Sequence, residues 1–173
     1  FRDFMTFDSI TIFAILAAFA LAGTLKGATG AGAPIITIPV IASFYDVRIA
    51  VVIMVLPNLL TNISQIYQFR KTILPHFFTF SFAFGGGIGA FFGTILLINL
   101  PIKILTLSVA FIVIIYITLK LIVPSWKLAY QRATKLVFIM GAGGGVLQGS
   151  AGLSAPVSIT FLNAMKLERN QFI

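Results

Sequence analysis

Residues 23–39, GTLKGATGAGAPIITIP, place four glycines and two prolines inside an apolar run. A related pattern returns without gaps at an offset of 122, in residues 145–161, GVLQGSAGLSAPVSITF. A Gly/Pro break at membrane depth is costly, because backbone groups there lack water and need partners in the protein or in a wet cavity. Paired breaks of this kind in two halves of a chain are the sequence pattern of a transporter's binding site. The identities that align the two stretches pair Gly23, Leu25, Gly27, Gly30, Ala33 and Pro34 with Gly145, Leu147, Gly149, Gly152, Ala155 and Pro156.

The composition is that of an integral membrane protein. Hydrophobic residues make up 59% of the chain and charged residues 9%, with a mean hydropathy of +1.07. A soluble domain carries roughly 25% charged residues. At least four runs without charge approach the length of about 20 residues that a spanning helix needs. These runs are residues 9–25, 49–69, 77–102, 104–119 and 136–165.

The net charge of +8 does not indicate a nucleic-acid partner, because the basic residues stand at the ends of the apolar runs. The positive-inside bias of membrane proteins puts them there. Two predicted spans separate the two basic loops, so both loops are predicted to lie on one side, the cytoplasmic one. The chain has no cysteine, which excludes disulfides and thiolate metal sites. The loops contain Arg70 and Lys71, and then Lys120, Lys127, Arg132 and Lys135.

The predicted fold is an all-α, polytopic transmembrane helical bundle of two repeated halves with Gly/Pro-broken helices. Residues 1–135 form the first repeat, and residues 136–173 begin a second repeat that is incomplete in this sequence. If the short segment 34–44 crosses the membrane, the halves are inverted, whereas a re-entrant segment makes them parallel. The predicted helices cover residues 10–25, 34–44, 49–69, 77–99 and 101–123, then 136 onward to a second break at 150–156.

Four polar residues form a stripe on the predicted helix 49–69: Asn58, Thr61, Asn62 and Gln65 stand at i, i+3, i+4 and i+7. Such a stripe faces protein or water, because an unpaired amide in hydrocarbon costs several kcal/mol. Two roles fit it equally well at this stage. One is adhesion between helices, at about 0.6 kcal/mol per bond, and the other is the lining of a cavity.

Lys26 closes the first predicted helix at an unusual depth. Snorkelling of its side chain to a near interface is preferred slightly over a cation beside an anion site. Residues 27–33 are not expected to be helical, because glycine costs roughly 1 kcal/mol in a helix interior.

Glycines also recur every four residues within two predicted helices, a spacing that lets a neighbouring helix approach closely. In the first helix this is read as packing alone. In the second, packing and binding are left open for the last two glycines. The two series are Gly85, Gly89 and Gly93, and Gly141, Gly145 and Gly149.

A helix that restarts at membrane depth offers an anion site, because its first N–H groups lack partners and carry about half a positive charge. Starts at Pro34 and Pro156 are expected to converge near the midplane if the halves pack about a pseudo-two-fold axis. Hydroxyl groups of Thr29, Ser150 and Ser154 add donors. The alternative is a pair of kinks that only pack.

An enzyme is not expected. The segment GSAGLS resembles a serine-nucleophile motif, but a nucleophilic serine needs a positioned base. The sole histidine, His76, stands at a loop edge, and none of the four carboxylates lies inside a long apolar run. We therefore predict no catalytic residue, no metal site and no cofactor.

The chain resembles the sulfite exporter TauE/SafE family of membrane permeases. The resemblance rests on GATGAGAPIITIP at 27–39, PNLLTN at 57–62 and GGGVLQGSAGLSAPV at 143–157. It implies a bacterial inner-membrane, multi-pass permease that moves small anions such as sulfite, organosulfonates or other organic acids by alternating access. One departure is that Ser154 stands opposite Gly32, so the halves would not bind a substrate symmetrically. The implied substrate-binding residues are Gly27, Thr29, Gly30, Gly32, Pro34, Asn58, Asn62, Gly149, Ser150, Gly152, Ser154 and Pro156.

The expected partners are the small anionic substrate and the lipid bilayer, with room for a coupling ion (proton or sodium) and for a homo-oligomer. Two alternatives stay open. A channel would use the breaks as a filter, and a non-transporting membrane assembly subunit would use the glycines for packing alone.

Overall fold

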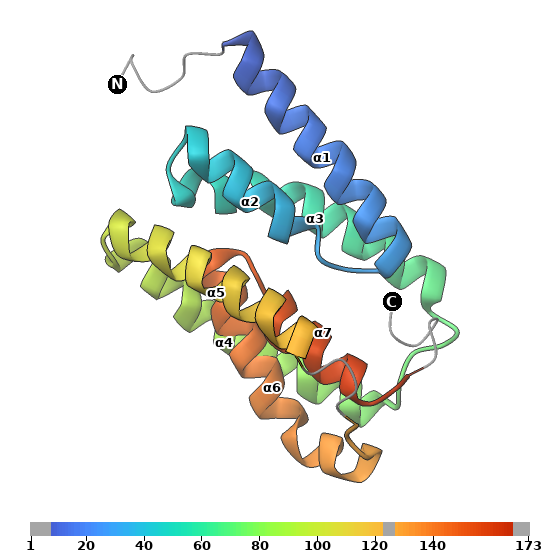
Figure 1. Cartoon of the computed structure of the whole chain (residues 1–173). Helices are drawn as coiled ribbons and strands as arrows, with labels where there is room; N and C mark the ends of the chain where they lie inside the picture. The colour runs from blue at the N-terminus through green and yellow to red at the C-terminus, as the bar shows by residue number, and fades with distance from the viewer. Residues whose placement is uncertain (1–7, 123–126, 168–173) are drawn as a thin grey trace.

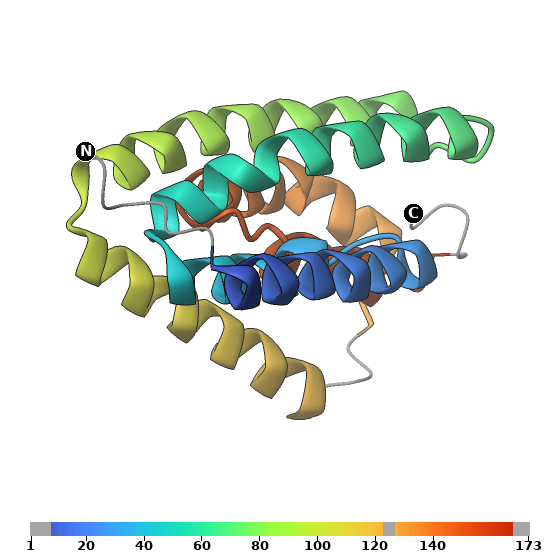
Figure 2. The ribbon, with the colours of Figure 1, turned by 90° about the horizontal axis from the view of Figure 1, so that it is seen from above.

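The computed structural model describes residues 8–122 and 127–167, and over those residues it contains seven α-helices and no strand (Figure 1). The predicted all-α fold is confirmed. Figure 2 shows α3 and α4 on one side of the bundle and α5 on the other. The helices are α1 (Ser9–Thr29), α2 (Ala33–Phe44), α3 (Val47–Phe69), α4 (His76–Asn99), α5 (Ile102–Ile122), α6 (Tyr130–Ala151) and α7 (Ala155–Ala164).

Four of the helices, α1, α3, α4 and α5, are long and apolar enough to cross a membrane, while α2 and α7 are shorter apolar helices. Large hydrophobic side chains cover their outer surfaces. Phe13, Phe80 and Phe111, for example, are each about two-thirds exposed or more. Apolar exposure on this scale marks a surface that meets lipid or another protein rather than water. The chain is a polytopic helical bundle, as predicted.

Two helix boundaries differ from the predicted ones by four residues or more. α6 already begins at Tyr130, so the predicted division between residues 135 and 136 falls inside a helix. α1 continues through Lys26 and Gly27 to Thr29, so residues 27–29 are helical against expectation. A glycine costs about 1 kcal/mol inside a helix, which is less than the cost of leaving backbone groups unpaired at membrane depth.

The contacts between helices fix their relative directions. Lys26 of α1 bonds to Asn62 of α3, and Gly30, just after α1, accepts a bond from Gln65 further along α3. α1 and α3 therefore run in the same direction. Arg48, at the start of α3, donates to carbonyl oxygens at the end of α4, so α4 runs the opposite way.

α4 and α6 are parallel, because glycines early and late in α4 meet early and late residues of α6. Gly85 lies against Phe138, and Gly93 lies against Ser150. It follows that α6 runs opposite to α1. The two broken pairs, α1–α2 and α6–α7, thus point in opposite directions, as the inverted arrangement of halves would require.

Glycines hold α4 and α6 together along their length. A Cβ atom at Gly89 would fall on the carbonyl oxygen of Ala142, and one at Gly145 on that of Gly86. A backbone atom cannot move aside as a side-chain tip can, so these positions require glycine. The predicted packing role is confirmed for Gly85, Gly89, Gly93 and Gly141. Gly145 and Gly149, for which packing and binding had both been left open, make the same close backbone contacts.

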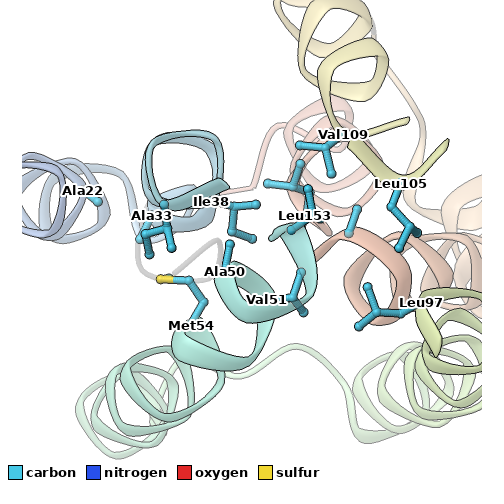
Figure 3. Packing of buried hydrophobic residues seen from close by; sticks show 13 residues of the cluster. Ala22, Ala33, Ile38, Ala50, Val51, Met54, Leu97, Leu105, Val109 and Leu153 are labelled. Carbon is cyan, nitrogen blue, oxygen red and sulfur yellow. The ribbon is translucent and has the colours of Figure 1, made fainter. Parts of the chain in front are cut away.

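The main hydrophobic core joins α2 to α3 and to the second break. Ile38 and Ile41 of α2 are fully buried, and Ala50, Val51 and Leu153 close around them (Figure 3). This core anchors the second break against the middle of α2.

A smaller core at the start of α4 brings the two basic loops together. Phe78 of α4 stacks on Phe161 of α7, and both Leu74 and Leu128, from the two loops, pack against this cluster. The loops therefore lie at one end of the bundle, as predicted. Their cytoplasmic side remains a prediction.

Candidate functional site

The first break separates α1 from α2 over residues 30–32. Gly30 and Gly32 adopt the left-handed conformation, with φ of 80° and 95°, which glycine adopts without steric cost. The N–H of Gly30 donates to the carbonyl of Lys26 at 2.7 Å and ends α1. Pro34 stands in the first turn of α2, where its missing N–H costs nothing, as predicted.

The second break separates α6 from α7 over residues 152–154. Gly152 is left-handed, with φ of 69°, and its N–H donates to the carbonyl of Gln148 at 2.9 Å. The side-chain Oε1 of Gln148 accepts a bond from the N–H of Ser154 at 3.2 Å. One of the donors expected to be free at the start of α7 is thus already paired by a side chain of α6.

Both breaks line one cavity of about 350 Å³. From the first break come Gly30, Gly32 and Pro34, and from the second come Leu153 and Ser154. The stripe on α3 supplies a third wall. Six of the twelve predicted site residues are brought together here: Gly30, Gly32, Pro34, Asn58, Asn62 and Ser154.

Lys26 lies in the wall of this cavity and is 6% exposed. Its Nζ donates to Asn58 Oδ1 at 2.8 Å, Thr61 Oγ1 at 2.7 Å and Asn62 Oδ1 at 2.6 Å. The preferred prediction of snorkelling is therefore wrong. The side chain crosses to α3 because three oxygens there satisfy its three N–H groups, which an apolar route to the interface does not offer.

The polar stripe of α3 faces Lys26 and the cavity, in agreement with the prediction that it meets protein or water, although Thr61 and Asn62 keep exposed surface. It takes both of the roles left open. Through Lys26 and through Gln65, whose Nε2 donates to the carbonyl of Gly30 at 2.8 Å, it ties α3 to the first break. Through Asn58, Asn62 and Gln65 it also lines the cavity.

A second cavity of about 330 Å³ lies between α1 and α3, on a more apolar stretch of both helices. Gly27, one of the predicted site residues, lines it together with Phe19, Gly23 and Met54. Lys26, Asn58 and Gln65 line both cavities. The bonds between Lys26 and α3 thus form a wall that the two cavities share.

The remaining predicted residues have local structural partners. Thr29 and Ser150 turn their hydroxyls onto carbonyls of their own helix or turn. Gly149 packs against Ala90 of α4, and a Cβ at Gly152 would meet Ile38. Pro156 stands in the first turn of α7.

Lys26 and Gln148 are among the cavity residues that the sequence analysis did not assign to the site. Lys26 was weighed mainly as a snorkelling residue, and Gln148 was not considered. Their positions differ by 122, the offset of the two stretches, so the alignment itself pairs them. Each break is preceded, four residues before its first glycine, by a polar residue, and this shared position was the signal that would have found both residues.

Comparison with known proteins gives one match. A family model described as Sulfite exporter TauE/SafE matches residues 15–173. No curated protein and no solved structure matches the chain.

Proposed function

The chain belongs to the sulfite exporter TauE/SafE family of membrane transporters, and on this premise we propose that it is a permease for small anions. The proposed substrates are sulfite, organosulfonates or other organic acids. The proposed mechanism is alternating access without catalysis or a cofactor, in a bacterial inner membrane.

One observation carries the proposal: two helix breaks far apart in the sequence line a single cavity whose wall contains a buried lysine. Lys26 is the one charged residue among the described residues that line it. Ionisable residues inside membrane segments are rare and face substrate or ion pathways.

The starts of α2 and α7 add to the positive potential of the cavity. Pro34 in the first turn of α2 and Ala155 in the first turn of α7 both line it. A helix N-terminus carries about half a positive charge. The cavity volume of about 350 Å³ suits a small molecule.

The opposite directions of the two broken pairs support alternating access. Inverted pairs that meet at a central site are the usual architecture of transporters that rock one unit against another around a fixed site. In this proposal α1–α2 and α6–α7 are the units whose relative tilt exposes the cavity to one side and then to the other.

The test is sulfite flux into proteoliposomes that contain the purified full-length protein, with taurine, sulfoacetate, lactate and chloride as competitors. We expect saturable flux with counterflow, abolished by Gly30→Leu and by Gly152→Leu. Flux that does not saturate and shows no counterflow would indicate a channel. Absence of flux for every anion, from folded protein, would overturn the proposal and leave an assembly subunit.

A further inference from the structure

Lys26 is a buried cation without a carboxylate near it among the described residues. Asp8 precedes α1 and lies about 27 Å along that helix from Lys26, at about 1.5 Å per residue. Asp46 caps the start of α3, about 18 Å along that helix from Asn58. A buried charge that lacks a counter-charge costs several kcal/mol, so its retention needs a reason.

The hydrogen bonds of Lys26 require the charged form. Thr61 uses its hydroxyl hydrogen on the backbone carbonyls of Pro57 and Asn58, so its oxygen accepts from Nζ. Asn58 and Asn62 also accept, through Oδ1. Three donated bonds need three N–H groups, and only the ammonium has them.

We propose that Lys26 is the counter-charge of the transported anion and that it leaves the oxygens of α3 to bind it. This inference rests on the proposed function. All three N–H groups are occupied by neutral oxygens, so direct contact with an anion requires that at least one of these bonds be given up. The exchange is favourable because an anion adds the Coulomb attraction between opposite charges, which a neutral oxygen does not offer, in a medium of low dielectric.

The exchange couples anion binding to a movement of helices. Lys26 joins α1 to α3 and stands in the wall that the two cavities share. When its N–H groups turn to an anion in the larger cavity, that tie is loosened. The second tie, from Gln65 to the carbonyl of Gly30, keeps the break in place.

A single ammonium also sets the charge of the substrate. Lys26 is the one full positive charge in the described lining and neutralises a monoanion. The second charge of a dianion would be left to the partial charges of the two helix starts, and at α7 one N–H group of that start is already paired with Gln148. The substrate class assigned to the site is therefore the singly charged oxyanion, of the sulfonate or carboxylate type.

The first experiment compares Lys26→Gln, Lys26→Arg and the matched control Lys103→Gln, which removes an exposed lysine from α5. Flux and direct binding of radiolabelled methanesulfonate are measured in proteoliposomes. Lys26→Gln is expected to weaken binding on the order of tenfold to a hundredfold, as for the loss of a hydrogen bond to a charged group. Lys26→Arg should retain binding in part, and Lys103→Gln should leave it unchanged.

Unchanged methanesulfonate binding in folded Lys26→Gln would overturn the inference while leaving the permease intact, since the parent would still transport. A parent without flux would instead overturn the proposed function.

A second measurement needs no variant at Lys26. Inhibition of flux in the parent protein is compared for methanesulfonate, its neutral analogue methanesulfonamide and ethane-1,2-disulfonate. Sulfonates keep their charge across the pH range of the assay. Methanesulfonate and methanesulfonamide are nearly equal in size and differ in charge, and the disulfonate adds a second charge together with a second sulfonate group. Inhibition by the monoanion at least about tenfold stronger than by the other two is expected. Equal inhibition by all three would contradict the role of Lys26, even if Lys26→Gln failed to fold.

Discussion

The two helix breaks share a sequence pattern and a backbone turn, yet they differ in what surrounds them. Gly30 and Gly152 occupy equivalent positions, are both left-handed and both end their helix with the same type of backbone bond. The residues four positions earlier differ: Lys26 reaches across to α3, whereas Gln148 turns back onto its own break. The first break is therefore held to α3 by a charged side chain, whereas the second is held by a side chain of the helix that precedes it.

The second break is also more tightly packed than the region of the first break. The second break is buried against Ile38 and Val51, and α6 is fixed to α4 by interlocking glycines. The last turns of α1, which lead into the first break, have open space beside Gly23 and Gly27. The Gly/Pro pattern therefore specifies the turn, and the flanking residues decide how tightly it is packed. In this account α6–α7 is the fixed wall of the cavity and α1 is the element that responds to the anion.

The largest effect on stability is expected at the glycine contacts between α4 and α6. Gly89→Leu should destabilise the protein by at least about 3 kcal/mol, because its side chain would meet the backbone of Ala142. Thermal unfolding in detergent micelles measures it. The matched control is Gly87→Leu on the same helix, where nothing lies within 4 Å and no loss is expected. Equal effects of the two substitutions would show that α4 and α6 do not pack as described.

The next effect concerns the tie at the first break. Asn62→Leu removes one acceptor of Lys26 and should cost about 2 kcal/mol, the cost of leaving a buried charged donor unpaired. Asn99→Leu, whose amide bonds only to a carbonyl within α4, is the control and should cost under about 0.5 kcal/mol. The difference in unfolding midpoints between the two variants checks this, and no difference would mean that Lys26 is not held by α3.

A smaller effect separates the backbones of the two breaks. Gly32→Ala should cost about 1–2 kcal/mol, because φ is 95° there and a side chain in the left-handed region is strained. Ser154→Ala, at the equivalent position with φ of −76°, should be nearly neutral. The free energies of unfolding of the two variants test this difference between the backbones of the breaks. A similar loss of stability at both positions would contradict it.

The smallest effect is expected at the hydrogen bond between Gln148 and the N–H of Ser154 in the second break. Gln148→Ala removes the acceptor for the N–H of Ser154 and should cost about 1 kcal/mol, as for a lost helix cap. Gln131→Ala, an exposed glutamine of the same helix, is the control. If methanesulfonate affinity fell as far in Gln148→Ala as in Lys26→Gln, the contrast between the breaks would be lost.

Much of the fold followed from the sequence, because apolar runs, prolines and glycine spacing act locally. A break that includes Gly30, the proline in the first turn of α2 and the packing role of the glycines of α4 were all predicted. The side-chain partners were not, because they depend on which helices become neighbours. The destination of Lys26 could not be predicted from its own surroundings, since the oxygens that hold it lie more than 30 residues away on α3.

The central claim, that both breaks form one anion site, is tested most directly by single-cysteine labelling. The native chain has no cysteine, so Ala31→Cys and Ser154→Cys each place one thiol in the cavity, one at each break. The rate of labelling by a membrane-permeant maleimide is measured against increasing methanesulfonate in proteoliposomes. The account predicts that both thiols are protected with the same half-saturating concentration. Protection of one thiol alone, or at clearly different concentrations, would contradict it.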